Sequence, residues 1–364
     1  MIPQETIQQL NGLDILRVLQ DEGLELKRAG THYECCCPFH GEKTPSFKVS
    51  TTRGTAHCFG CGKTWGPISF VMERYAMNFV EACRHLGNRY DIKWEEKEPT
   101  PEELAKRFER DQLFRANNIA LEFFRSMYRQ SEPAQKYATG RWDEATIEEW
   151  CIGYAPGRKT LLRHIREQHE NLDIFIKAGL IKVSDADGDI YDAFTQRLMF
   201  PIRNIRGQVI AFSARTMIGE EPKYINTGDT PIFTKGSEVF GLYEARKSIQ
   251  DKKRVIVVEG QMDVIQLSQA GFGEACAPLG TAIRAEHIER LLKMTDHVIF
   301  SFDGDAAGRK AAKRAMDLSL PLLDDAQKVS FVFLPEGEDP DSLVKKSGAL
   351  AFEELSLIHI SEPT

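Results

Sequence analysis

The distribution of hydrophobic and polar residues is most regular between Lys252 and Leu334. There, short apolar runs such as "RVIVVEG", "HVIFSFDGD" and "KVSFVFLP" alternate with longer segments of helical spacing. The runs are rich in β-branched and aromatic residues and are too short for helices, so they predict buried strands. Strands that alternate with helices indicate an α/β unit with a largely parallel sheet.

The chain ahead of this unit is organised differently. Residues 1–93 contain a cysteine cluster and end in a helical pattern. The stretch 94–103, "WEEKEPTPEE", is charged and contains prolines, which is typical of an exposed linker. Helical spacing follows, and then a mixture of short strands and turns. The sequence therefore predicts a multidomain protein of α/β and α+β class, with domains at 1–93, 104–251 and 252–345.

Composition narrows the class of protein. Apolar residues make up 42% of the chain and charged residues 28%, as in soluble globular proteins. No run approaches the ~20 apolar residues of a membrane span, and the N-terminal stretch lacks the pattern of a signal peptide. We therefore expect the eight cysteines to serve metal binding or redox chemistry in a reducing compartment. The net charge of −7 excludes a uniformly basic nucleic-acid binder but leaves room for local basic tracks.

Acidic residues follow the predicted strands of the α/β unit. Taken alone, the Asp-Gly-Asp sequence that begins at Asp303 is ordinary turn chemistry. In a parallel sheet, however, the carboxyl ends of the strands meet at one rim, where ligands collect. Carboxylates gathered there would repel one another, which favours a site for a divalent cation such as Mg²⁺. The acids predicted at this rim are Glu259, Asp303, Asp305, Asp339 and Asp341.

Two pairs of residues in the cysteine cluster have the spacing of a zinc site. Cys37-Pro-Phe-His40 and Cys58-Phe-Gly-Cys61 each leave a two-residue gap, so each can chelate one side of a tetrahedral ion. They predict one structural Zn²⁺ per chain, bound by Cys37, His40, Cys58 and Cys61. The competing ligands nearby are Cys35, Cys36 and His57.

The motifs around these residues resemble one known family. "VVEGQMDVI", "FSFDGDAAGRKAA" and "GEDPDSLV" resemble the Toprim domain, in the version found in DnaG-type bacterial primases. "CPFHGEKTPSF" and "CFGCG" resemble the N-terminal zinc-binding domain of the same family. The resemblance implies an N-terminal zinc ribbon, a mixed α+β primase core and a Toprim α/β domain.

The resemblance also implies roles for the acids. Glu259, Asp303 and Asp305 would be the catalytic acids and would bind Mg²⁺ or Mn²⁺, with Asp339 and Asp341 assisting. One such ion can lower the pKa of a primer 3′-hydroxyl, while another neutralises the triphosphate. Glu259 would be either a metal ligand or a proton acceptor.

The middle of the chain contains "RLMFPI", "PKYIN" and "FTKG", which resemble the primase catalytic core. Scattered basic residues are usually solvated. By this resemblance, a set of them would instead bind the template backbone or the phosphates of the incoming nucleotide. The set is Arg141, Arg197, Arg215, Lys223, Asn226 and Lys235.

The cysteine-rich region also contains aromatic and basic residues with two possible uses. Phe47, Lys48, Arg53 and Phe59 can present rings and cations to a single-stranded template. Alternatively, the two phenylalanines form the core of a small domain that has few apolar residues to bury.

The resemblance implies a DNA primase, which synthesises short RNA primers on single-stranded DNA by metal-dependent nucleotidyl transfer. The alternative is a Toprim recombination or repair protein, or a nuclease, that makes no primers. Expected partners are single-stranded DNA, ribonucleoside triphosphates and, for the full-length protein, a replicative helicase whose binding domain is absent here. We expect no membrane association and a cytoplasmic location in a bacterium, with a chromosomal, phage or plasmid gene.

The last ten residues, "LSLIHISEPT", resemble the translation of a transposon-end sequencing adapter. We therefore expect residues 355–364 to be a non-native tail and the natural sequence to diverge after about residue 354.

Overall fold

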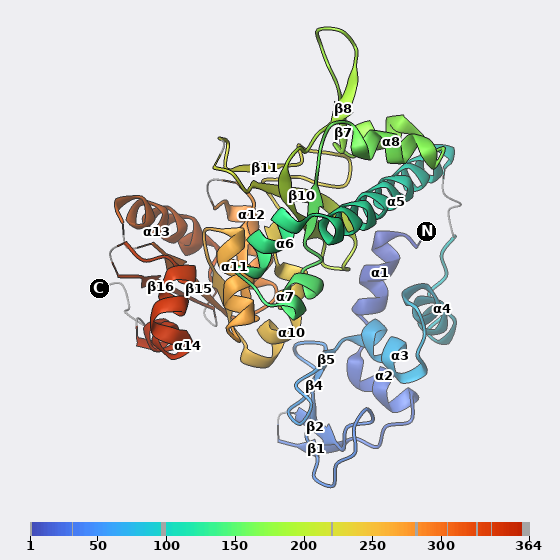
Figure 1. The fold of residues 1–364 in the computed structure, drawn as a ribbon. Helices are drawn as coiled ribbons and strands as arrows, with labels where there is room; N and C mark the ends of the chain where they lie inside the picture. Colours follow the sequence, from blue (N-terminus) through green and yellow to red (C-terminus); the bar gives the residue numbers. More distant parts are fainter. Residues whose placement is uncertain are drawn as a thin grey trace. The chain divides into compact units, whose positions relative to one another are not determined.

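The computed structural model describes residues 2–30, 32–95, 100–219, 221–280, 283–303, 305–324, 327–335 and 337–358, apart from the side chains of Ala307, Asp341 and residues 355–358. The chain forms two compact units, Met1–Leu104 and Ala105–Thr364. Figure 1 shows their helices and strands in the order of the sequence.

The first unit is built around a five-stranded antiparallel sheet in the order β1-β2-β3-β4-β5. Alternate residues of β3 are buried, so that Phe47 and Val49 enter the core. The ring of Phe47 contacts Trp65 and Phe70, both of which are buried. The elements are α1 (Gln4–Asn11), α2 (Ile15–Asp21), β1 (Lys27–Ala29), β2 (His32–Cys35), β3 (Phe47–Ser50), β4 (Thr55–Cys58), β5 (Thr64–Trp65), α3 (Pro67–Tyr75) and α4 (Phe79–Arg89).

The helical pattern expected at the end of this unit is divided into two helices. Helix α3 ends before Ala76, which has a left-handed backbone conformation. Asn78 then caps α4, since its side chain accepts the N–H of Glu81 at 3.0 Å while the Glu81 carboxylate accepts the N–H of Asn78 at 2.8 Å. This capping box explains why an apolar pattern that continues in sequence is interrupted in space.

The second unit contains a four-stranded antiparallel sheet in the order β11-β10-β9-β6. The long helix α5 covers this sheet, and the rings of Phe124 and Phe212 meet edge to face at 5.3 Å. A separate hairpin of β7 and β8 projects from the unit (Figure 1). The elements are α5 (Pro101–Gln130), α6 (Glu132–Thr139), α7 (Glu144–Glu149), β6 (Gly153–Ala155), α8 (Thr160–Glu167), α9 (Leu172–Lys177), β7 (Ile181–Val183), β8 (Ile190–Asp192), β9 (Arg197–Arg203), β10 (Val209–Thr216) and β11 (Tyr224–Asn226).

The predicted α/β sheet follows, in the order β12-β14-β13-β15-β16. Strands β14, β13, β15 and β16 run parallel to one another, and β12 is antiparallel to β14. The prediction of an α/β unit with a largely parallel sheet is therefore confirmed. The elements are β12 (Val239–Phe240), α10 (Leu242–Lys252), β13 (Val255–Val257), α11 (Gln261–Gln269), β14 (Ala275–Pro278), α12 (Ala285–Leu292), β15 (His297–Phe302), α13 (Ala306–Ser319), the 3₁₀ turn η1 (Leu320–Leu322), β16 (Lys328–Phe333) and α14 (Pro340–Ile358).

The connections of this sheet define where a ligand can bind. Strands β13 and β15 are neighbours, but the chain leaves β13 toward β14 and leaves β15 toward β16 on the other side. The space outside their carboxyl ends is a topological switch point, which is the usual ligand site of open α/β sheets. Helices α11 and α14 pack in the core on one face of the sheet, and α12 and α13 pack on the other.

Some predictions about organisation are not decided by this fold. Residues 105–251 and 252–345 fall in one compact unit, so the predicted boundaries at 93, 103 and 251 stay predictions. Within the expected tail, the backbone of α14 extends to Ile358, while residues 359–364 lie outside the described part of the chain. Among the described helices, none combines the length and the apolar character that crossing a membrane requires.

Candidate metal centres and phosphate-binding surface

The first unit brings together the four residues predicted to bind zinc. The ligand atoms of Cys37, His40, Cys58 and Cys61 all lie within 4.8 Å of one another. Cys58 ends β4 and is fully buried, whereas Cys61 lies in the turn that follows and is exposed. Three thiols and one imidazole at this spacing are a donor set that suits tetrahedral Zn²⁺, so the residues present fit the ion.

The competing cysteines and histidine do not join this group in the described part of the chain. Cys35 is part of β2, where it pairs with Phe47 of the neighbouring strand. His57 is held away by its own hydrogen bond, between Nδ1 and the hydroxyl of Thr64 at 2.8 Å. The register Cys37–His40 that the spacing predicted is therefore the one whose atoms converge.

In the second unit, the predicted acids lie around the switch point of the parallel sheet. Glu259 directly follows β13 and Val258, and its carboxylate accepts a hydrogen bond from the backbone N–H of Asp303. Asp303 follows β15. Gly308 of α13 allows this arrangement, because a Cβ atom at that position would overlap the backbone of Asp303. The absence of a side chain at Gly308 thus lets α13 approach the end of β15 closely.

Two further acids of the rim act as helix caps. The Asp305 carboxylate accepts the N–H of Gly308 at 2.7 Å and caps α13. The Asp339 carboxylate accepts the N–H of Ser342 at 2.7 Å, at the start of α14. The positive ends of two helix dipoles therefore face the acidic rim and reduce its repulsion. The turn and metal interpretations of Asp-Gly-Asp are compatible, since Asp305 caps the helix with one oxygen.

The electrostatics of the rim indicate uncompensated negative charge. Burial, together with the charges of Glu259, Asp339 and Asp305, raises the pKa of Asp303 to about 6. Burial also raises the pKa of Glu259 despite the opposing hydrogen bond from Asp303, and the charge of Asp305 adds to the increase. No lysine or arginine in the described residues forms an ion pair with Glu259, Asp303 or Asp339.

Carboxylates without a counter-charge suit a divalent cation. Among the described side chains, no three of these acids bring ligand atoms as close together as the thiols and imidazole of the first unit do. The side chain of Asp341, the fifth predicted acid, lies outside the described part of the structure, although its backbone belongs to the first turn of α14. The rim thus fits a cation that also takes oxygens from a substrate, as Mg²⁺ commonly does.

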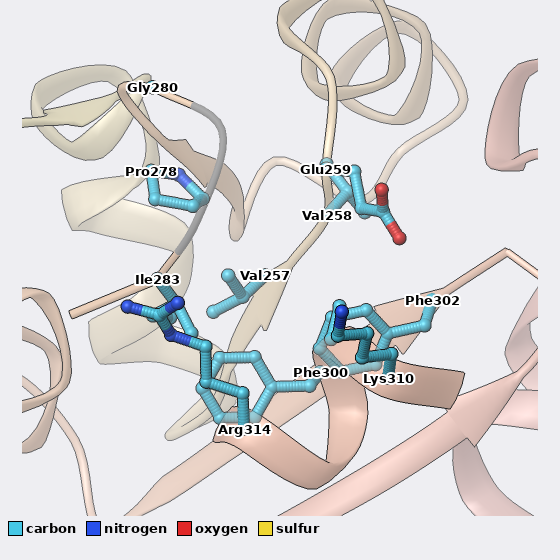
Figure 2. Close-up of a pocket in the computed structure, with 11 residues that line it drawn as sticks. Val257, Val258, Glu259, Pro278, Gly280, Ile283, Phe300, Phe302, Lys310 and Arg314 are labelled. Carbon is cyan, nitrogen blue, oxygen red and sulfur yellow. The ribbon is translucent and has the colours of Figure 1, made fainter. Parts of the chain in front are cut away.

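A cavity of about 500 Å³ opens beside Glu259 (Figure 2). Its floor is apolar and includes Val257 and Phe300 from the two central strands. Lys310 and Arg314, one turn apart on α13, also line the cavity, and Lys310 is the nearer of the two to Glu259 in Figure 2. Neither cation was singled out by the sequence, because a run of basic residues on a helix is usually a solvated face.

Two of the residues predicted to bind phosphate lie on one face of the antiparallel sheet. Arg215 of β10 is paired with Tyr224 of β11 and donates a 2.7 Å hydrogen bond to its hydroxyl. Asn226 lies two residues further along the same strand, so it shares this face. Arg215 Nε and Asn226 Oδ1 are both buried without a hydrogen-bond partner. Asp263 of α11 interacts electrostatically with Tyr224, which connects this face to the parallel sheet.

The other basic residues are distributed more widely. Arg197 pairs with Thr216 in the sheet register and so lies on the opposite face from Arg215; it is only 6% exposed and donates to the carbonyl of Lys223 at 3.3 Å. The Lys223 side chain is exposed. Lys235 is partly buried, and its backbone N–H is bound by the Asp229 carboxylate at 2.8 Å.

Arg141 stacks over the ring of Tyr137 at 5.0 Å. The structure therefore brings Arg215 and Asn226 together and places Arg197 apart from them.

The sequence left open whether Phe47 and Phe59 form the core of the first unit or contact a template, and the structure gives the two residues different surroundings. Phe47 is fully buried and belongs to the core. Phe59 is 67% exposed, and its ring contacts Lys48 at 5.3 Å and His57 at 4.6 Å. Lys48 and His57 are cross-strand partners on β3 and β4, so the three side chains form one aromatic and cationic patch on the outer face of the sheet.

The sequence reasoning did not identify several residues that shape these sites. They are Glu42, Ser46 and Gly60 around the zinc ligands, Gly308 beneath Asp303, and Tyr224 beside Arg215. Glu42 lies two residues from His40, and an acid so close in sequence to a predicted ligand could have been identified as a contact of the zinc site. No sequence pattern identifies Gly308, because its role depends on how closely α13 approaches the end of β15.

Three family models match the chain. They are described as CHC2 zinc finger, at residues 2–102, DNA primase catalytic core, N-terminal domain, at residues 123–246, and Toprim domain, at residues 253–333. The fold and the two candidate centres thus define a Toprim protein that carries a zinc-ribbon module.

Similar proteins and structures identify the family. A DNA primase of Pseudomonas aeruginosa is 43% identical over 364 residues, covering 97% of this chain and 54% of the relative. A DNA primase of Neisseria meningitidis serogroup A is 42% identical, covering 100% of this chain and 62% of the relative. The chain therefore spans little more than half the length of these curated relatives.

Solved structures agree in fold. The Aquifex aeolicus primase, with its zinc-binding and RNA polymerase domains, is 33% identical with a TM-score of 0.63, covering 97% of this chain and 85% of that one. A DnaG primase catalytic domain bound to single-stranded DNA is 40% identical with a TM-score of 0.65, covering 68% and 81% respectively. The chain belongs to the DnaG primase family.

Removing a zinc ligand should distinguish the predicted register from its competitors. We expect metal analysis of the purified chain to find one zinc, and Cys61→Ser to lose it because only three ligands remain. Cys35→Ser and Cys36→Ser should retain zinc, since neither side chain belongs to the converging group. If Cys36→Ser empties the site while Cys37→Ser keeps it, the register is wrong.

The stability of the metal-free protein should depend on pH through Asp303. Its pKa is raised from 3.8 to about 6 in the folded state, so between these pH values the folded chain binds more protons than the unfolded chain. Stability is therefore lost as the pH rises toward and through about 6. Asp303→Asn should remove this loss, and be more stable than the parent by about 1 kcal/mol at pH 7.5, a value reduced for solvent screening of a half-buried group.

Thermal melts in EDTA-treated buffer at pH 5.0 and 7.5 measure this difference. Asp143→Asn is the control with opposite sign, because a hydrogen bond from the Thr146 N–H lowers the pKa of Asp143. A difference between Asp303→Asn and the parent that does not grow with pH would contradict the repulsion described for the rim.

Proposed function

We propose that the chain carries the primer-synthesising part of a DNA primase, which joins ribonucleotides on a single-stranded DNA template by metal-dependent nucleotidyl transfer. The observation that supports this best is the position of Glu259 and Asp303 at the switch point of the parallel sheet, with no counter-cation among the described residues. A sheet face with an unpartnered arginine nitrogen and an unpartnered amide oxygen, on Arg215 and Asn226, is connected to the same region through Tyr224.

The proposed roles follow from the chemistry of each residue. Glu259, Asp303 and Asp305, assisted by Asp339 and Asp341, hold Mg²⁺ or Mn²⁺, which supplies charge neutralisation for phosphoryl transfer and a lower pKa for an attacking hydroxyl. Asp305 and Asp339 also keep the first turns of α13 and α14 in place. The raised pKa of Asp303 implies that the rim gains most from a cation above about pH 6, where this acid is ionised.

The basic residues would hold phosphates. We assign Arg215, Asn226, Lys223, Lys235 and Arg141 to the template backbone or the incoming nucleotide, because arginine binds phosphate with two N–H groups and lysine acts as a point charge. Arg197 acts through another residue: it is buried and donates a hydrogen bond to the carbonyl of Lys223, so it positions the backbone of that lysine.

The zinc-binding unit would contact the template. The patch of Lys48, His57 and Phe59 offers an exposed ring beside the cation of Lys48, which is the chemistry that binds unpaired bases and their backbone. One related structure is a catalytic domain bound to single-stranded DNA, which supports the same substrate for this chain. We propose ribonucleoside triphosphates as the second substrate and, for the full-length protein, a replicative helicase as partner, in the bacterial cytoplasm.

The alternative is a Toprim nuclease or a recombination mediator without primer synthesis. Such a protein would use the acids or the DNA-binding surface alone. It would leave no role for the sheet face of Arg215 and Asn226, or for Lys223. A template-directed assay separates these functions: single-stranded DNA, labelled ribonucleotides and Mg²⁺ or Mn²⁺ yield short RNA for a primase, cleaved DNA for a nuclease and neither for a mediator.

Neutralising an acid of the rim should separate catalysis from stability. Asp303→Asn and Asp305→Asn should reduce primer synthesis by at least about 100-fold relative to the parent, because electrostatic stabilisation of the transferred phosphoryl group is lost. Neither should melt earlier than the parent without metal, because repulsion falls and asparagine caps α13 as well as aspartate. Variants that melt early yet still make primers would contradict the metal-site proposal.

Removing the phosphate-binding lysines should weaken binding without affecting the metal site. Lys223→Ala and Lys235→Ala should raise the apparent template or nucleotide requirement several-fold, and the dependence of template affinity on salt should become less steep. Lys182→Ala is a matched control, since it removes an exposed lysine on the β7–β8 hairpin. Fluorescence anisotropy of a labelled single strand at several salt concentrations measures the effect. Unchanged affinities in both variants would mean that the two lysines are solvated surface residues with no role in binding.

A further inference from the structure

The carboxylate of Glu42 lies against the zinc-binding group and divides its hydrogen bonds between its two oxygens. Oε1 accepts the backbone N–H of Cys37 at 2.6 Å and that of Ser46 at 3.2 Å. Oε2 accepts the hydroxyl of Ser46 at 2.5 Å and lies 3.1 Å from Nε2 of His40. The Glu42 side chain is only 11% exposed, so these partners replace most of its water. One oxygen holds the loop, and the other faces side chains of the metal site.

The orientation of His40 gives this second oxygen a specific consequence. Nδ1 of His40 is turned toward Sγ of Cys58, 3.9 Å away, while Nε2 is turned toward Glu42. A neutral imidazole carries a proton on one nitrogen and a lone pair on the other. A carboxylate accepting from Nε2–H therefore leaves the lone pair on Nδ1, which is the nitrogen inside the metal site.

Ser46 extends the same contact to a cysteine. Its hydroxyl oxygen lies 3.1 Å from Sγ of Cys58 while its proton is donated to Glu42. Gly60 closes the arrangement, because a Cβ there would lie 2.7 Å from Nε2 of His40 and 2.9 Å from Oγ of Ser46. Glu42 and Ser46 are thus packed between the two ligand pairs with no room for a larger residue at position 60.

We propose that Glu42 is a positioning residue of the zinc site: Oε2 fixes the His40 tautomer with its lone pair on Nδ1, and orients the Ser46 hydroxyl beside Cys58. This role is distinct from that of the four ligands and does not depend on primer synthesis. Outer-shell carboxylates of this kind contribute about 10- to 100-fold to metal affinity. The competing explanation is that Glu42 only holds the loop between Cys37 and Ser46 through Oε1.

Glu42→Gln separates the two explanations. The amide oxygen can still accept the two backbone N–H groups, but the amide nitrogen that replaces Oε2 cannot accept a proton from His40 or Ser46. We expect zinc affinity, measured by chelator competition on the purified chain, to fall about 10- to 100-fold. The visible spectrum of the Co²⁺-substituted site should also change. Glu73→Gln is the matched control, because Glu73 bonds Trp65 Nε1 at 2.8 Å and Lys63 at 2.7 Å in the same unit but touches no ligand.

A double-mutant cycle tests whether the effect passes through the histidine. In a His40→Cys background, which keeps four zinc-binding side chains, Glu42→Gln should cost much less affinity, because the imidazole that needs orienting is gone. An equal loss in both backgrounds, or a loss matched by Glu73→Gln, would overturn the proposal in favour of the loop-holding role.

If Glu42→Gln does not fold, the zinc-loaded parent still decides the question. Nitrogen chemical shifts of His40 should identify a protonated Nε2 and a metal-bound Nδ1. The reverse assignment would overturn the proposal.

Discussion

Repulsion between carboxylates is the constraint on which the second unit depends. Glu259 and Asp303 follow neighbouring parallel strands, so the sheet itself forces them together. The fold tolerates this because a backbone N–H binds Glu259 and because the starts of α13 and α14 face the rim. Burial, together with the negative charge that these contacts leave uncompensated, raises the pKa of Asp303. The same residual charge is what makes the rim able to attract a cation.

The first unit is constrained differently, because a small domain has few apolar residues with which to stabilise its fold. Its core is a single cluster around Phe47, Trp65 and Phe70, and Cys37 and Cys58 of the predicted zinc site are part of that cluster. A metal ion held there would stabilise folding as well as the local loop. Because Phe47 and Cys58 are cross-strand partners, the core and the ligand site share one strand pair.

The sequence predicted these elements to very different extents. Strands β13, β15 and β16 could be predicted because short apolar runs end at charged turns, and the zinc spacing could be predicted because chelation depends on local chain geometry. The face on which Arg197 lies could not, since "RLMFPI" is buried on both faces of its strand and shows no alternation. The use of Phe59 rather than Phe47 at the surface likewise required the structure, in which Phe47 of β3 is buried and Phe59, in the turn after β4, is exposed. Contacts such as Gly308 with Asp303 depend on tertiary approach and have no sequence pattern of their own.

The capping by Asp305 and Asp339 has a consequence for anyone who wishes to transplant this acidic rim to another protein. Each of these side chains is held by a backbone N–H of a helix that begins beside it, so its direction is a property of that helix. Copying the carboxylates onto loops of a new scaffold would reproduce their composition but leave them free to turn away from one another. A functional graft would have to transfer the strand ends and the first turns of both helices together. Gly308 would have to be kept, because a side chain there would overlap the backbone of Asp303.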